Sequence, residues 1–153
     1  MRNKSEIILS RHFMKNDRML WYRRIHSIFL SNTMIATPKS ESTMGKTCSQ
    51  LFVSDKVFVA TYTMRRQEEF NTELHLFWKE IDVPVSLIVD DHRAQTSIKL
   101  RIFCDQVGTI LKILVKSTHW TNRAEMYIGL LKEAVRKYIH ALHSPIVLWD
   151  YAI

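Results

Sequence analysis

Two carboxylates in this sequence have the setting that metal-ion chemistry requires. Asp90 closes an apolar run at 85–89, and Glu125 stands near the start of a long amphipathic segment. Carboxylate oxygens are the ligands that Mg²⁺ and similar hard cations prefer. Two cations held about 4 Å apart can activate a water or a 3′-hydroxyl and stabilise the leaving oxygen. The two residues are therefore candidates for a divalent-metal site.

The same carboxylates also have an ordinary structural explanation. An aspartate at the end of a strand often caps a turn, and a glutamate in the first turn of a helix is stabilised by the helix dipole. On spacing alone we favour this structural explanation, so the metal hypothesis needs further support from the sequence.

The apolar pattern predicts an α/β domain with the two carboxylates separated by one helix and one strand. Short apolar or alternating runs predict strands at 28–36, 49–54, 57–64, 85–89 and 110–115. Three- and four-residue spacings predict helices at 65–81, 96–107 and 122–142, followed by a short helix from 144 to 149. In the second helix we expect Ile98, Ile102, Phe103 and Val107 to face inward, and Gly108 to be the C-cap. The order is βββαβαβαα. We expect a mixed five-stranded sheet flanked by helices, whose first three strands form an antiparallel meander.

Composition places limits on the class of protein. The 153 residues suit one domain, and the net charge of +7 favours a polyanionic partner such as nucleic acid. Cys48 and Cys104 are far apart, which argues against a cysteine zinc site and predicts buried thiols in a reducing compartment. Neither a signal peptide nor a membrane-spanning run is visible. We expect an intracellular protein, nuclear or cytoplasmic and not secreted.

The first part of the chain differs from the rest. Residues 1–26 are rich in Lys and Arg and have no clear apolar period. We interpret them as a basic leader, poorly ordered or the end of an upstream segment. Residues 27–153 then form the core domain, which we expect to be truncated at its C-terminus.

Five short motifs follow one another along the chain: Gly45–Asp55, Leu87–Asp90 with Gln95-Thr96, Thr118–Glu125, Gly129–Val135 and Leu148–Tyr151. Together they resemble the integrase catalytic core of copia-type retrotransposons, over about residues 15–153. This resemblance implies an RNase H-like fold and the joining of DNA ends to target DNA. It also implies Mg²⁺ or Mn²⁺ as cofactor, DNA as partner, and a possible homo-oligomer.

The resemblance further implies a metal-binding triad of two aspartates and one glutamate. Asp90 matches the second position and Glu125 the third, although Asp91 follows where the family often has Gly, so either aspartate could be the ligand. The first position is Asn32, and no carboxylate occurs between Ser27 and Ser40. Asn is neutral and a weaker Mg²⁺ ligand than Asp. We therefore expect weak or absent catalysis.

The long helix carries a possible nucleic-acid-binding face. Glu125, Gly129, Lys132 and Arg136 recur at steps of four, three and four, which places them on one side of a helix. The resemblance implies that this side contacts DNA phosphates, with Asn122 and Arg123 as further contacts. The alternative is that Lys132 and Arg136 are ordinary solvated side chains.

Three functions remain open on the sequence. The first is a metal-dependent polynucleotidyl transferase core with an impaired site. The second is a catalytically dead relic of a transposon polyprotein that still binds nucleic acid. The third is an unrelated α/β domain for a small molecule, which would need a Gly-rich phosphate loop that the sequence does not contain.

Overall fold

The computed structural model describes residues 24–36, 41–92, 95–114 and 123–153. The strands are β1 (Arg24–Ile35), β2 (Cys48–Ser54), β3 (Val59–Met64), β4 (Val83–Asp90) and β5 (Ile110–Leu114). The α-helices are α2 (Phe70–Glu80), α3 (Ile98–Val107) and α4 (Arg123–Ala141), and two 3₁₀ helices are η3 (Gln67–Glu69) and η5 (Ile146–Tyr151). The predicted order of elements is confirmed, with the last short helix in the 3₁₀ form.

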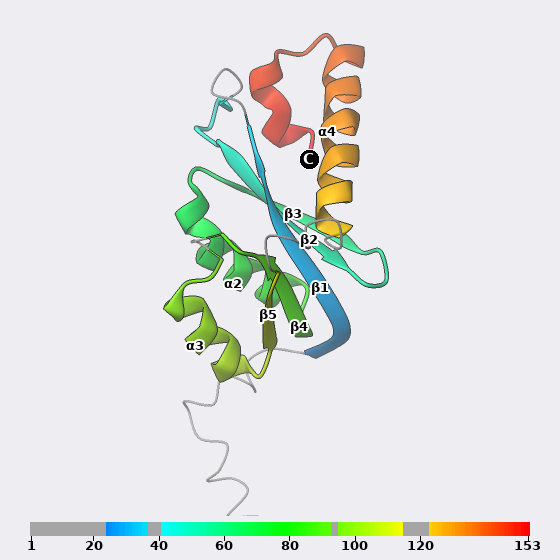
Figure 1. Ribbon diagram of the computed structural model, residues 1–153. Coiled ribbons are helices and arrows are strands. Elements are labelled where there is room, and N and C mark those ends of the chain that lie inside the picture. Colours follow the sequence, from blue (N-terminus) through cyan, green and yellow to red (C-terminus); the bar gives the residue numbers. More distant parts are fainter. Residues whose placement is uncertain (1–23, 37–40, 93–94, 115–122) are drawn as a thin grey trace, which may run out of the picture.

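The five strands form one mixed sheet in the order β3-β2-β1-β4-β5. β1, β2 and β3 pair antiparallel as the predicted meander, whereas β4 and β5 run parallel to β1 and to each other (Figure 1). β1 is therefore the central strand, and it joins the antiparallel part of the sheet to the parallel part. The α/β class with a mixed five-stranded sheet is confirmed.

Helices cover both faces of the sheet (Figure 1). One face, called here the α2/α3 face, packs buried residues of β1, β2 and β4 against α2 and α3. The other, the α4 face, packs residues of β1 and β2 against α4 and η5. Because successive side chains of a strand point to opposite faces, each strand contributes alternately to the two cores.

β1 begins at Arg24, inside the segment that we predict to be a leader. The Arg24 guanidinium donates hydrogen bonds to the carbonyls of Val107, at 2.5 Å, and Gly108, at 2.7 Å. These carbonyls end α3, where helix carbonyls lack partners and positive charge is favourable. At least one basic residue of that segment thus has a structural role.

β3 begins at Val59 and not at the predicted Val57. Val57 lies in a turn with φ of 67°, and the Ser54 hydroxyl accepts hydrogen bonds from the backbone N–H groups of Lys56 (3.2 Å) and Phe58 (2.9 Å). A β-branched residue rarely adopts positive φ, so the sequence favoured a strand there. The connection between β2 and β3 is longer than predicted for this reason.

α3 differs from its prediction in the side that it buries. Ser97 caps its N-terminus and Gly108 ends it with φ of 69°, the predicted left-handed C-cap. Leu100, Phe103, Cys104 and Val107 are buried, whereas Ile98 and Ile102, which we expected inside, are 76% and 50% exposed. The buried set has the regular three- and four-residue spacing of one helix side, and this side packs in the core of the α2/α3 face.

Candidate metal and nucleic-acid site

Asn32 and Asp90 lie next to each other on neighbouring parallel strands. Ser31 of β1 pairs with Val89 of β4, so the residues that follow them are also neighbours. Val89 belongs to the core of the α2/α3 face. By alternation Asn32 and Asp90 point to the α4 face, on strands about 4.8 Å apart. Both side chains are half-buried.

Glu125 lies on the same face of the sheet. It stands in the first turn of α4, next to Ala124, which is fully buried against the sheet. Ala124 and Ile128 share their core with Leu30 of β1, two residues before Asn32. Glu125 itself is exposed. The structure therefore brings Asn32, Asp90 and Glu125 to the same face.

Asn32 and Asp90 differ in the chemistry of their two terminal side-chain atoms. Oδ1 of Asn32 accepts from the Thr33 N–H at 2.7 Å, and Oδ1 of Asp90 accepts from the Asp91 N–H at 2.9 Å. The second terminal atom of Asp90 is another anionic oxygen. The second terminal atom of Asn32 is an N–H₂ group, which donates hydrogen bonds and cannot bind a cation.

The residues that are present fit a divalent cation less well than three carboxylates would. Within the described ranges, no three His, Cys, Asp or Glu side chains gather closely enough to hold a metal ion. Asp90 and Glu125 offer charged oxygens, whereas Asn32 offers only a neutral one. Asp91 is exposed in the bend that follows β4.

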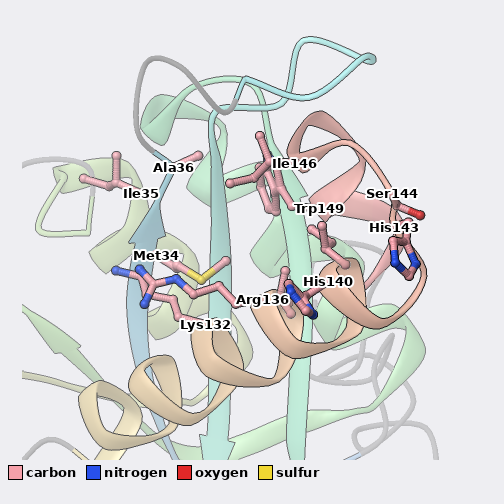
Figure 2. A pocket seen from close by; sticks show the side chains of 12 residues that line it. Met34, Ile35, Ala36, Lys132, Arg136, His140, His143, Ser144, Ile146 and Trp149 are labelled. Atoms are coloured by element: carbon pink, nitrogen blue, oxygen red, sulfur yellow. The ribbon is translucent and has the colours of Figure 1, made fainter.

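The predicted DNA-contacting residues of α4 line a groove. Lys132 and Arg136 border a depression of about 490 Å³ between the end of β1, α4 and η5, with Met34, Ile35 and Trp149 among its other lining residues (Figure 2). None of the lining residues in the described part of the chain is acidic. Glu125, Gly129, Lys132 and Arg136 are all exposed, as the predicted helix side requires. Arg123 is exposed at the first residue of α4, and Asn122 lies outside the described residues.

Sequence reasoning missed a group of buried polar residues beneath this site. Ser31, Gln50 and Gln95 are at most 1% exposed, and with Thr33 they form hydrogen bonds on the α2/α3 face. A signal was available, because Gln50 interrupts the otherwise small and apolar run Cys48–Ser54. A buried glutamine must find hydrogen-bond partners, which makes such an interruption informative.

This sheet order and these flanking helices are those of an RNase H-like domain of the integrase-core type. Among solved structures, the chain is similar to the HTLV-2 integrase catalytic core domain in complex with magnesium, in a dimeric form. The TM-score is 0.64 at 17% identity, over 84% of this chain and 80% of that one.

The chain is also similar to a chain of the simian T-cell lymphotropic virus intasome in complex with the PP2A regulatory subunit B56 gamma. Here the TM-score is 0.68 at 14% identity, over 86% of this chain. The match spans about half, 49%, of that intasome chain. At such identities the similarity shows the fold. No family model and no curated protein matches the sequence.

A membrane span requires a helix of sufficient length and apolarity. None of the described helices is long and apolar enough to cross a bilayer.

Proposed function

We propose that this chain is the nucleic-acid-binding integrase core of a copia-type retrotransposon, with DNA integration activity impaired at Asn32. The observation that carries the proposal is the placement of Asn32, Asp90 and Glu125 on one face of an integrase-type sheet. The ordered motifs of the sequence, from Gly45–Asp55 to Leu148–Tyr151, support the retrotransposon type.

In this proposal Asp90 and Glu125 hold Mg²⁺ or Mn²⁺. We assign the second ligand to Asp90 rather than Asp91, because Asp90 ends β4 beside Asn32 whereas Asp91 lies in the following bend. The Asp91 N–H donates to Oδ1 of Asp90 and so helps to orient this carboxylate. A bound cation would activate the attacking oxygen of a polynucleotidyl transfer. Asn32 withholds one negative charge from that cation, which weakens its binding.

The test is a strand-transfer assay with Mn²⁺ on the chain and on Asn32→Asp. We expect the native chain near background and a gain of at least about tenfold for Asn32→Asp, equivalent to about 1.4 kcal/mol of transition-state stabilisation. Asn32→Asp combined with Glu125→Gln is the control and should lose the gain. The lost-ligand explanation fails if Asn32→Asp gains nothing while Glu125→Gln alters metal binding.

DNA contact is proposed for the groove side of α4. Lys132 and Arg136 are exposed and border a groove that no acidic residue of the described chain lines, a few residues along β1 from Asn32. Arg123, at the first residue of α4, and Asn122, which lies outside the described residues, are proposed as further contacts. Each lysine or arginine that neutralises a phosphate releases a counterion, so affinity falls as salt rises.

Replacement of both groove cations by glutamine tests this contact. The double variant Lys132→Gln, Arg136→Gln should reduce the slope of log affinity against log salt by about 2. Lys99→Gln is the matched control, because Lys99 is exposed on α3, across the sheet. An equal loss of affinity in the control would mean that binding is diffuse over the basic surface.

The alternative is a catalytically dead relic that binds nucleic acid without metal, and Asn32 is the observation in its favour. The two proposals separate when DNA affinity is measured with Mg²⁺ and with a chelator. The relic predicts equal affinities, and the impaired enzyme predicts tighter binding with metal. A homo-oligomer also belongs to the proposal, and sedimentation velocity would measure it directly.

A further inference from the structure

Beneath the proposed metal site, a side-chain network joins three strands on the α2/α3 face. Gln50 Nε2 of β2 donates to Ser31 Oγ at 2.5 Å, and Thr33 Oγ1 donates to Gln50 Oε1 at 2.7 Å. Ser31 and Thr33 are the two neighbours of Asn32 in β1. Their hydroxyls therefore hold the backbone on both sides of Asn32 from the opposite face of the sheet.

Gln95 extends this network to the end of β4. Its Nε2 donates to Thr33 Oγ1 at 2.9 Å, while its Oε1 accepts from the backbone N–H of Asp90 at 3.2 Å. The side chain is 1% exposed, so each of these polar atoms needs its partner. Gln95 thus connects the strand of Asn32 with the backbone of Asp90.

The position of this bridge is significant because the regular pairing of the two strands ends just before it. The last pair of the parallel β1–β4 ladder is Ser31 with Val89. Asp90 and Thr33 lie beyond it, and the Gln95 amide spans them. Two backbone hydrogen bonds lie beside the bridge, from His92 N–H to Asp90 O at 2.7 Å and from Gln95 N–H to His92 O at 2.8 Å.

We infer that Gln95 is a positioning residue, which fixes the Asp90 carboxylate relative to position 32 by bridging β4 to β1 across the end of their ladder. This inference rests on the proposed function, because it concerns the geometry of that metal site. Gln95 lies on the opposite face and does not touch the cation. Residues that orient metal ligands typically change metal affinity by 10- to 100-fold, so a loss of about tenfold is expected without Gln95.

The variant Gln95→Met keeps the length of the side chain and removes its amide. Val107→Ala is the matched control, since Val107 is 1% exposed in the same core and its truncation lowers stability without touching the network. Both changes are made in the Asn32→Asp chain, and Mn²⁺ binding is measured by the paramagnetic resonance of free Mn²⁺. Gln95→Met should weaken binding about tenfold and Val107→Ala less than twofold. Equal effects of the two variants would overturn the positioning role.

A second measurement does not need the metal. In the chain with Asn32 retained, amide hydrogen exchange at Asp90 should become at least about tenfold faster in Gln95→Met than in Val107→Ala, because the acceptor of that N–H is lost. Unchanged exchange at Asp90 overturns the inference even if metal binding changes. A third outcome is faster exchange at Asp90 together with no Mn²⁺ binding by the Asn32→Asp chain. That result would overturn the proposed function and leave Gln95 as a purely structural bridge.

Discussion

The two faces of the sheet differ in the side chains that form their cores. The α2/α3 face holds a continuous aromatic core, in which Phe52 and Phe77 stack at 4.3 Å and Trp78 lies 4.6 Å from Phe103. The core of the α4 face is made mostly of aliphatic residues, and several of its members, such as Ile128 and Val135, are still 8% exposed. The candidate ligands and the groove are on this second face. The aromatic core and the candidate metal ligands thus lie on opposite faces of the sheet.

The difference between the two cores bears on whether a substitution among the candidate ligands would disturb the fold. Asn32 and Asp90 are half-buried on the α4 face, and neither belongs to the hydrophobic core of either face. A change from a carboxylate to an amide there alters charge and leaves the aromatic core of the other face untouched. Under the proposed function, an asparagine in place of an aspartate at position 32 would therefore leave this core in place.

The largest predicted effect compares one core residue from each face. Phe77→Ala removes a fully buried ring that packs on Phe29, Phe52 and Tyr62, so we expect a loss of about 4 kcal/mol in the free energy of unfolding. Ile128→Ala on the α4 face should cost about 2 kcal/mol, because that site is partly open to water. Chemical denaturation of both variants measures the difference. Equal losses would show that the two cores contribute alike.

The sequence could predict the order of elements and the shared face of the site, for identifiable reasons. Strands β4 and β5 are short apolar runs, and the helices have clear three- and four-residue spacings. The local sequence pattern is therefore sufficient to predict these elements. Asn32, Asp90 and Glu125 come together through the topology of a fold that the motifs already implied. The features that the sequence did not predict correctly depend on individual tertiary contacts.

Val57 and Gln95 illustrate those failures. Val57 favours a strand by its side chain, but the Ser54 hydroxyl stabilises a turn around it. In the sequence Gln95 is only part of a motif, and its burial is not predicted. Its burial depends on Thr33, 62 positions earlier in the chain, which no local pattern can indicate. Ile98 and Ile102 are expected inside from local spacing, whereas α3 buries Leu100, Phe103, Cys104 and Val107 in the core of the α2/α3 face.

A smaller predicted effect concerns the exposed side of α4. A Cβ added at Gly129 would meet no atom within 4 Å, and the residue lies inside a regular helix. Gly129→Ala should therefore raise the free energy of unfolding by about 0.5–1 kcal/mol, since alanine loses less backbone entropy. If DNA approaches α4 closely, the same variant should bind DNA less tightly. A gain in stability without any change in affinity would place DNA elsewhere on the surface.

The smallest predicted effect is a dependence of stability on pH. It concerns Asp55, which directly follows β2 and is hydrogen-bonded to β1. The Ser27 hydroxyl donates to Asp55 Oδ1 at 2.8 Å, the Ile28 N–H donates to the same oxygen at 3.3 Å, and together they hold the pKa of Asp55 below its ordinary value. A carboxyl whose pKa is lowered by folding stabilises the fold above its unfolded pKa of about 3.9 and loses that contribution as pH falls through the folded pKa.

Ser27→Ala should therefore raise the pKa of Asp55, measured by NMR titration of the carboxyl carbon, and destabilise the chain more at pH 7 than near pH 3. Ser54→Ala is the matched control, because the Ser54 hydroxyl accepts from Lys56 and Phe58 N–H groups in the same turn and involves no carboxylate. Its cost should be the same at both pH values. A Ser27→Ala cost that is also independent of pH would mean that the hydroxyl contributes by packing, since its hydrogen bond to the ionised carboxylate is the only part of its role that titrates in this range.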